Sequence, residues 1–390
     1  MYSSLIRDVL LLLAVGPLAY YALAILAAVG YFGRRKKTAE EVREFTPPAS
    51  ILKPVRGLDR DAYENFASFC SLNYPEHEIL FCVSDAGDPA IPVIEKIISD
   101  FPERQIRLLV GSLEIGASSK VNKLCRLASE AKYDLLVISD SDVRVGPNYL
   151  RSVSSHFADP RVGAVTAFFR SEATGSFGAR LDAAGSAVEF ASVALLAQWL
   201  EGIRFTLGAT MATTKARLAE IGGFEALRNH YVDDHELGHR IAAMGYSIRL
   251  ADEPVLLVYP RESLRQFILH ELRWTIGLRN VRAVGHAALA FTFGLPWTVL
   301  AAAVAPTRGI AGLYLLAYLC LRYAVYGVVG IWGLKDPVTR KWWVLAPVRD
   351  AIQFGVWIVS FFSNKISWRG LEFQVKQGLL IPIANGRETK

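Results

Sequence analysis

Two carboxylates at the end of an apolar run are the residues of this chain best suited to chemistry. Asp140 and Asp142 are separated by one serine, and they follow residues 135–139, which are almost wholly apolar with β-branched residues at the centre. Such a run is long enough for a buried strand and too short for a core helix. Open α/β sheets bind ligands at the carboxyl ends of their strands. Two carboxylates at this spacing suit a hard divalent cation that itself holds a diphosphate.

Three more polar residues stand near the ends of expected elements. Asp85 follows a strand-like run at 78–83, where an acidic residue can bind a nucleobase or ribose, or simply cap the next helix. Lys120 and Asn122 lie at the start of the helix that leads to the acidic pair. A lysine there can contact phosphate, and the alternative is an ordinary solvated helix face.

Asp234 is the candidate general base. It follows Asp233 at the start of a helical stretch over 235–244. The alternative is a helix cap. A helix N-terminus depresses the pKa of a carboxylate, so a base at this position needs partial burial near the substrate.

The same stretch contains His-Glu-x-x-His at 235–239, the zinc signature of metalloproteases. A protease also needs a third zinc ligand. Ala242 and Gly245 stand where the extended pattern requires glycine and histidine. A membrane zinc protease therefore stays as an alternative that depends on a distant acidic ligand, for which the candidates are Glu253, Glu262 and Glu271.

Arg273 and Trp274 lie in an amphipathic stretch over 264–282, whose apolar residues keep helical spacing. The arginine can clamp a diphosphate leaving group, and the tryptophan can line a sugar or lipid site. The alternative is an interfacial helix with a tryptophan anchor and snorkelling arginines.

Composition indicates membrane segments joined to a water-soluble domain. Of 390 residues, 52% are hydrophobic and 21% are charged, and the mean hydropathy is +0.27. The net charge is +6, but the basic residues gather at the ends of apolar stretches and form no stripe with interleaved aromatics. This pattern favours membrane topology over nucleic-acid binding.

The N-terminal region, 1–33, is predicted to be a transmembrane helix. Residues 9–32 carry no charge and are long enough to cross a bilayer. Four basic residues follow at 34–37, which predicts that the chain enters the cytoplasm there.

The C-terminal region, 286–363, is predicted to hold transmembrane or re-entrant helices. Residues 286–305 and 310–334 look like spans, whereas 343–362 contains Arg, Asp and Gln and is expected to be re-entrant or interfacial. A basic cytosolic tail is expected over 364–390.

Between them, 48–285 is expected to be an α/β domain with a mostly parallel, doubly wound sheet, ending in the amphipathic helix. Strands are predicted at 50–53, 78–83, 107–110 and 135–139, and helices at 90–100 and 118–131.

The order Asp, Asp-x-Asp, helix-opening Asp and Arg-Trp before membrane spans resembles the inverting GT-A glycosyltransferases of family 2. More closely, the chain resembles the ceramide glucosyltransferase family, family 21, and bacterial relatives that glycosylate hopanoids. The similarity covers about 48–285, and its ordered matches include KPVRGLD at 53–59, SDSDVRV at 139–145 and HELRW at 270–274.

The resemblance implies a donor site for a UDP-sugar. Asp85 would bind the uridine, Asp140 the ribose–diphosphate region, and Asp142 would hold Mg²⁺ or Mn²⁺ on the diphosphate. Lys120 and Asn122 are included in this donor site.

The resemblance also implies the catalytic residues. Asp234 would be the base, and Arg273 with Trp274 would match the Arg-Trp of a Gln/Arg-x-x-Arg-Trp motif. His270 replaces the Gln or Arg of that motif.

The expected function is transfer of a sugar from a UDP-sugar to a lipid hydroxyl, in the manner of a ceramide glucosyltransferase. A hopanoid N-acetylglucosaminyltransferase is the alternative, and diacylglycerol is a further conceivable acceptor. A processive polysaccharide synthase would need more spans, and an inactive nucleotide-binding scaffold is a rival of another class. The protein is expected in a membrane, with a cytosolic catalytic domain, in the inner membrane of a bacterium.

Overall fold

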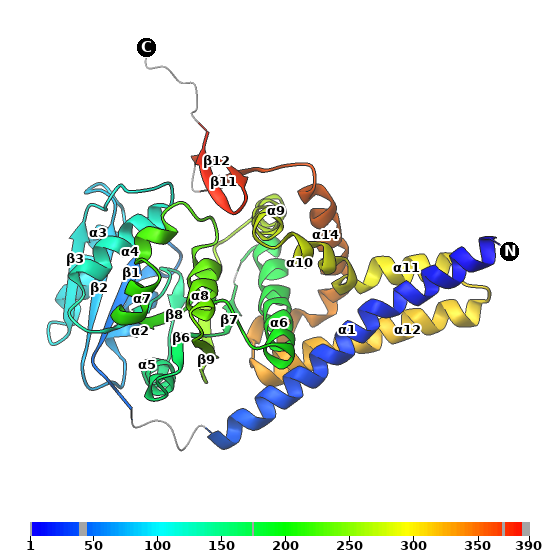
Figure 1. Ribbon diagram of the computed structural model, residues 1–390, viewed down its shortest axis with the longest axis horizontal. Coiled ribbons are helices and arrows are strands. Elements are labelled where there is room, and N and C mark those ends of the chain that lie inside the picture. Colours follow the sequence, from blue (N-terminus) through cyan, green and yellow to red (C-terminus); the bar gives the residue numbers. More distant parts are fainter. Residues whose placement is uncertain (1, 39–44, 174, 369–370, 384–390) are drawn as a thin grey trace, which may run out of the picture.

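The computed structural model describes residues 2–38, 45–173, 175–368 and 371–383 (Figure 1). Its central sheet has seven strands in the order β3-β2-β1-β4-β8-β6-β9. The first four are mutually parallel, β8 is antiparallel to β4 and β6, and β9 is parallel to β6. In sheet order, the strands span Gln105–Val110, His77–Val83, Ala49–Pro54, Leu135–Ile138, Met211–Thr214, Val162–Thr166 and Ser247–Leu250. The predicted mostly parallel α/β sheet is confirmed.

Every residue of β1, β2, β4 and β6 is buried, as expected for strands covered on both faces. The connecting helices bury their apolar stripes against the sheet, as Ile94 and Ile97 of α3 illustrate. The helices that connect strands β1 to β4 are α2 Ala62–Cys70, α3 Ile91–Asp100 and α4 Ser119–Glu130.

A second, three-stranded sheet supports the chain that leaves β4. It has the order β5-β10-β7, with strands Val143–Arg144, Val255–Val258 and Phe169–Glu172. The backbone N–H of Val258 donates to the carbonyl of Asp142 at 2.9 Å. The acidic pair is therefore held from both sides, by the end of β4 and by β10.

Within the described ranges, three helices are long and apolar enough to cross a membrane, or there are four candidate spans if a bent pair counts as one. Two of them match the expected spans at 9–32 and 310–334, and the bent pair, kinked by 57°, matches 286–305. The helices here are α1 Tyr2–Thr38, α10 Ala283–Ala288, α11 Gly294–Val304 and α12 Arg308–Val325. In Figure 1, α1, α11 and α12 lie side by side and extend away from the sheet.

The third such helix, α6 (Phe177–Leu200), was placed inside the soluble domain by the sequence and was not expected to be a candidate span. It lies between the sheet and the other candidate spans and contacts α1, α9 (Leu264–Val281) and α14 (Ala346–Ser360) (Figure 1). Strands β6 and β8, before and after α6, pair with each other in one sheet. Both ends of α6 must therefore lie on the same side of a membrane, so α6 cannot be a single crossing.

The described part of the segment expected to be a basic tail, 364–368 and 371–383, folds back onto the α/β domain, and the rest of that segment lies outside the described residues. Strands β11 Lys365–Trp368, β12 Leu371–Lys376 and β13 Leu379–Pro382 form an antiparallel sheet. The N–H of Tyr231 donates to the carbonyl of Gly378 at 2.9 Å, and that of Leu380 to Asn229 at 2.8 Å. The C-terminal sheet touches the domain that precedes the candidate spans, so any membrane crossings between the two must be even in number. Helix α14 (Ala346–Ser360), only 15 residues long, then need not cross.

Candidate active site

Lys120 links two acidic segments at the carboxyl ends of the parallel strands. Its ammonium lies 2.9 Å from Asp140 at the end of β4, and 3.3 Å from Asp233 at the start of α8 (Asp233–Ala243). Burial alone would lower the pKa of Lys120, but Asp140, Asp233 and Asp234 outweigh it and raise that pKa above its ordinary value. Lys120 is therefore a permanent positive charge within an acidic cluster.

Gly208 is the point on which this cluster converges. A Cβ placed on Gly208 would lie 3.2 Å from one oxygen each of Asp140 and Asp234, and 3.6 Å from the Lys120 ammonium. The structure thus brings together the predicted metal–diphosphate handle, the predicted base and the predicted phosphate-binding lysine. The small residue between them leaves open the space that their polar atoms share.

The segment that carries Gly208 is fixed against α8. The Thr206 hydroxyl donates to the carbonyl of Asp234 at 2.7 Å. A Cβ on Gly238 would approach the backbone nitrogen of Thr206 to 2.4 Å, so only glycine allows this contact. The glycine inside His-Glu-x-x-His therefore has a packing role.

Asp142 has the properties of an incomplete cation site. Its Oδ1 is buried and has no hydrogen-bond partner among the described residues. Burial, then Asp140 and Asp59, raise the pKa of Asp142 to about 7. The buried Oδ1 of Asp142, which no described donor meets, offers an oxygen ligand beside a second carboxylate, so the donor set fits a hard metal ion.

Two neighbours of this site, Lys53 and Asp59, were not predicted, although both belong to the motif at 53–59. The Lys53 ammonium donates to the carbonyl of Asp140 at 2.7 Å and lies 3.9 Å from the centre of the Phe69 ring. Burial lowers the pKa of Lys53 to about 7. The Asp59 carboxylate accepts a hydrogen bond from Ser141, between the two acidic residues.

Asp234 is poised for proton transfer near neutral pH. Burial and the adjacent Asp233 raise its pKa to about 7, more than Lys120 and the hydrogen bond from the N–H of His235 lower it. One oxygen accepts from the N–H of His235 at 2.8 Å, and the other faces Gly208. The helix cap is Val232, so neither aspartate occupies the capping position.

The zinc-protease alternative finds no support in the described residues. The rings of His235 and His239 stack with their centroids 6.0 Å apart, and Glu236 pairs with Arg240 at 2.6 Å. No third ligand joins the histidines in the part of the chain that the structure describes. Each proposed third ligand has other neighbours: Ser152 at the Glu253 backbone, Asp182 and His270 near Glu262, and Arg349 at Glu271.

Two predicted donor-site residues lie apart from the Gly208 cluster. Asp85 is exposed just after β2, and its carboxylate accepts from the N–H of Gly87 at 2.9 Å. Asn122 uses both polar atoms of its side chain on the backbone of Gly116, at 2.9 and 3.1 Å. Its amide therefore holds the loop before α4, and it is Lys120 alone that extends from this helix into the acidic cluster.

Arg273 and Trp274 lie in helix α9 (Leu264–Val281), which contacts the segment just before Asp234. The hydroxyl of Tyr231, three residues before Asp234, donates to the carbonyl of Arg273 at 3.1 Å. Trp274 is 39% exposed, and its ring meets Phe190 of α6 edge to face at 6.0 Å. Trp274 also donates from Nε1 to Nε2 of His270 at 2.8 Å.

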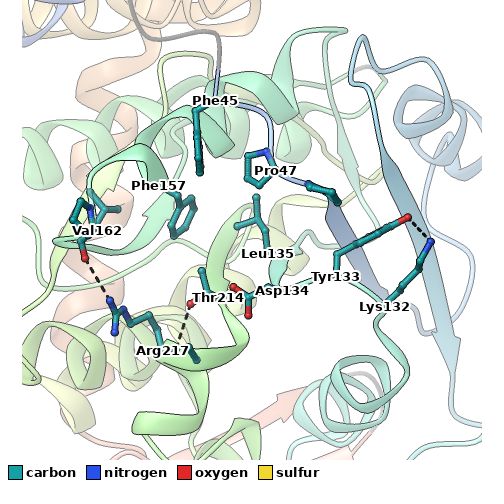
Figure 2. A pocket seen from close by; sticks show the side chains of 13 residues that line it. Phe45, Pro47, Lys132, Tyr133, Asp134, Leu135, Phe157, Val162, Thr214 and Arg217 are labelled. Atoms are coloured by element: carbon teal, nitrogen blue, oxygen red, sulfur yellow. Dashed lines mark hydrogen bonds between the residues drawn. The ribbon is translucent and has the colours of Figure 1, made fainter.

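A cavity of about 560 Å³ lies elsewhere, at the amino ends of the parallel strands (Figure 2). Its walls include Leu135 at the start of β4, Val162 at the start of β6, and Thr214 at the end of the antiparallel β8. Asp140 and Asp142 stand at the other end of β4. This cavity is therefore separate from the acidic cluster, and the strand direction excludes it as the site of those carboxylates.

The chain shares its sequence pattern with a known family and with named enzymes. The profile of glycosyl transferase family 21 matches residues 9–381. Ceramide glucosyltransferase 3 of Caenorhabditis elegans is 24% identical over 283 residues, which cover 68% of this chain and 59% of that protein. Ceramide glucosyltransferase of Komagataella phaffii is 33% identical over 143 residues, 34% of this chain and 28% of that protein. The chain therefore matches less than two thirds of the length of these relatives.

The fold is also found in a solved glycosyltransferase. The mannosyltransferase PcManGT from Pyrobaculum calidifontis, solved with GDP-Man and Mn²⁺, superposes with a TM-score of 0.52 at 17% identity. The match covers 90% of this chain and 99% of that one. This likeness confirms the expected GT-A architecture, and the profile match over almost the whole length settles the family: the chain belongs to glycosyl transferase family 21.

Proposed function

We propose that this protein is a membrane-bound inverting glycosyltransferase that moves a sugar from a UDP-sugar to a lipid hydroxyl, as a ceramide glucosyltransferase does. The observation that carries the proposal is the convergence of Asp140, Asp234 and Lys120 on Gly208, beside the unpaired oxygen of Asp142. The names of the matched relatives support the lipid acceptor. The catalytic domain would face the cytosol, and the inner membrane of a bacterium is the proposed location.

The donor half of the site would consist of Asp85, Lys120, Asp140 and Asp142. Asp142, with Asp140 beside it, would hold Mg²⁺ or Mn²⁺, which neutralises the diphosphate and stabilises its departure. The Mn²⁺ and GDP-Man in PcManGT support a divalent cation and a nucleotide-sugar here. Asp85, exposed at the end of β2, would accept hydrogen bonds from the uridine.

The catalytic half would consist of Asp234 and Arg273. Asp234 takes the proton from the acceptor hydroxyl. The hydroxyl oxygen attacks the anomeric carbon from the face opposite the leaving UDP. A single displacement of this kind inverts the configuration at that carbon. Arg273 would stabilise the negative charge on the departing diphosphate.

The acceptor would approach from the membrane side, past Trp274. That residue and Phe190 form a partly exposed aromatic pair between the sheet and the membrane helices. An aromatic pair at such a boundary suits a lipid whose headgroup must reach the aqueous site while its chains stay apolar. Ceramide is the proposed acceptor, and a hopanoid headgroup is the alternative.

The proposal is tested with the purified full-length protein in lipid nanodiscs. UDP-glucose and UDP-N-acetylglucosamine are each offered with ceramide and with a hopanoid polyol. We expect a glycolipid with the inverted anomeric configuration by NMR, formed with Mn²⁺ or Mg²⁺ and lost with EDTA. Hydrolysis of the UDP-sugar without any glycolipid would contradict the proposal.

The raised pKa of Asp234 predicts a pH dependence. A base acts only when it is unprotonated, so kcat/KM should be level above about pH 7. Below that pH it should fall about tenfold per unit. The profile is measured with saturating metal, alongside the affinity for UDP at each pH. A rate that stays constant from pH 5 to 8 would contradict this assignment.

Gly208→Ala should reduce kcat by about 10²-fold with little loss of stability. The added methyl would press on Asp140 and Asp234 at 3.2 Å, and small displacements of reacting groups cost this much. Gly312→Ala in α12 is the matched control, because a Cβ there meets nothing within 4 Å. Equal kcat for the two variants would contradict the placement of the reaction at Gly208.

A further inference from the structure

A second polar cluster lies where α6 meets α9, on the side of Trp274. Asp182, Glu262 and His270 place one ligand atom each within 4.8 Å of one another. Asp182 and Glu262 are only 1% and 7% exposed. Buried carboxylates at such separations require partners, so the hydrogen bonds of each residue decide what this cluster can bind.

His270 has both ring nitrogens engaged. Its Nδ1 lies 3.0 Å from an oxygen of Asp182, and its Nε2 lies 2.8 Å from Nε1 of Trp274. An indole N–H can only donate, so Nε2 is the acceptor and Nδ1 carries the proton toward Asp182. No lone pair on the ring is then left for a metal ion, and the cluster in this arrangement does not offer a histidine ligand.

Asp182 is also satisfied. Its carboxylate accepts from the hydroxyl of Ser186 at 2.6 Å and from His270, and Arg349 lies 3.8 Å away. Arg349 also donates to the backbone carbonyl of Asp182 at 2.8 Å. The Asp182–His270 pair is therefore a fixed wall, held in place by α6 and by the arginine from α14.

Glu262 differs from its two neighbours. Its backbone N–H donates to Ser176 at 3.1 Å, but its carboxylate has no hydrogen-bond or ion-pair partner among the described residues. Burial, then Asp182, raise the pKa of Glu262 to about 7. The carboxylate oxygens of Glu262 are not fully enclosed, so a ligand that brings a donor can reach them and replace water in a largely buried position.

The position of Glu262 relates it to the reaction site through Arg273. His270 of this cluster accepts from Trp274, and the carbonyl of the preceding residue, Arg273, accepts from the hydroxyl of Tyr231, three residues before Asp234. Glu262 therefore lies on the Arg273 side of the base, next to the histidine that binds Trp274. A headgroup that enters past Trp274 toward Asp234 would pass this carboxylate.

We propose that Glu262 binds the acceptor headgroup by accepting a hydrogen bond from a second donor group near the reacting hydroxyl, with Asp182 and His270 as the fixed wall beside it. This inference rests on the proposed lipid glycosyltransferase function. It selects acceptors by chemistry: an amide N–H, as in ceramide, or a neighbouring hydroxyl, as in a hopanoid polyol, satisfies Glu262. Diacylglycerol has one hydroxyl and two esters, so it has no further donor to offer.

The test uses the full-length protein in nanodiscs with ceramide, bacteriohopanetetrol and dioleoylglycerol as acceptors. The wild type should favour one of the first two over dioleoylglycerol by at least about tenfold in kcat/KM, as expected for one hydrogen bond to a charged group. Glu262→Met should raise the KM of that acceptor about tenfold and leave its kcat and the Kd for UDP nearly unchanged. Glu262→Gln, which keeps one acceptor oxygen, should fall between.

Glu103→Met is the matched control, since Glu103 is an exposed glutamate in the turn after α3 and should not alter acceptor KM. Equal use of dioleoylglycerol by the wild type, or an unchanged acceptor KM in Glu262→Met, would overturn the role of Glu262 while leaving lipid glycosylation intact. A wild-type protein that glycosylates none of the three lipids would overturn the proposed function itself, and this inference with it.

Discussion

Asp234→Asn is expected to lower the rate of sugar transfer by 10²- to 10⁴-fold, the range that a general base contributes. The amide keeps the size of the carboxylate and can still accept the hydrogen bond from His235, but it cannot take a proton. Because Asp234 would contact the acceptor hydroxyl and not the diphosphate, the Kd for UDP in the presence of Mn²⁺ should change less than about threefold. Transfer is measured as product per time at saturating substrates, and binding by calorimetry.

His239→Ala is a suitable control on the same helix. His239 is exposed one turn from His235, and the proposed mechanism gives it no role. We expect its activity to match the wild type, whereas a zinc protease would lose its metal. Full activity in Asp234→Asn would rule out this residue as the base.

Asp142→Asn is expected to remove metal-dependent activity, with a rate loss of at least about 10²-fold. The buried Oδ1 of Asp142 has no partner among the described residues, so its charge would be balanced by the cation. In contrast to Asp234→Asn, this change should weaken the binding of UDP and Mn²⁺ together. Titration of Mn²⁺ into the EDTA-treated variant should restore little activity.

Asp134→Asn provides the control at the other end of the same strand. Asp134 is exposed just before β4 and lines the separate cavity, so the change removes one carboxylate without touching the proposed metal site (Figure 2). Wild-type metal dependence is expected. If Asp142→Asn and Asp134→Asn had the same Mn²⁺ requirement as the wild type, the cation would have to be held elsewhere.

The strands and helices near the acidic pair could be predicted from local pattern. The apolar run before Asp140 became β4, Ser118 caps α4, and the helix-opening aspartates begin α8. Each of these depends on residues close in sequence, which is where periodicity and capping carry information.

Helix α6 and the C-terminal sheet could not be predicted in this way. An apolar helix has the same sequence pattern whether lipid or protein covers it. The pairing of β6 with β8, on either side of α6 in the chain, shows that α6 is not a single membrane crossing. The bridge between Gly378 and Tyr231 joins segments far apart in the chain. Such long-range contacts leave no periodic signal in one sequence.

The candidate site shows the same division. Asp140, Lys120 and Asp234 were predicted separately, and the structure brings them together at Gly208. Lys120 and Asn122 both lie at the start of the helix before the acidic pair, and the sequence predicts both for the donor site. Residues two apart on a helix point in different directions, and Asn122 faces the loop before α4 instead. Lys53 and Asp59 belong to the motif at 53–59, but they meet the acidic pair through contacts between segments far apart in the chain, which local pattern does not reveal.

The most direct test of the central claim is a lipid extract from cells that express this chain, compared with cells that express Asp234→Asn at the same level. Mass spectrometry is used to find hexose- or N-acetylhexosamine-bearing lipids absent from cells with an empty vector. The proposed mechanism predicts a new glycolipid with the wild-type chain and none with the variant. The same glycolipid in both samples, or no new glycolipid with the wild-type chain, would contradict it.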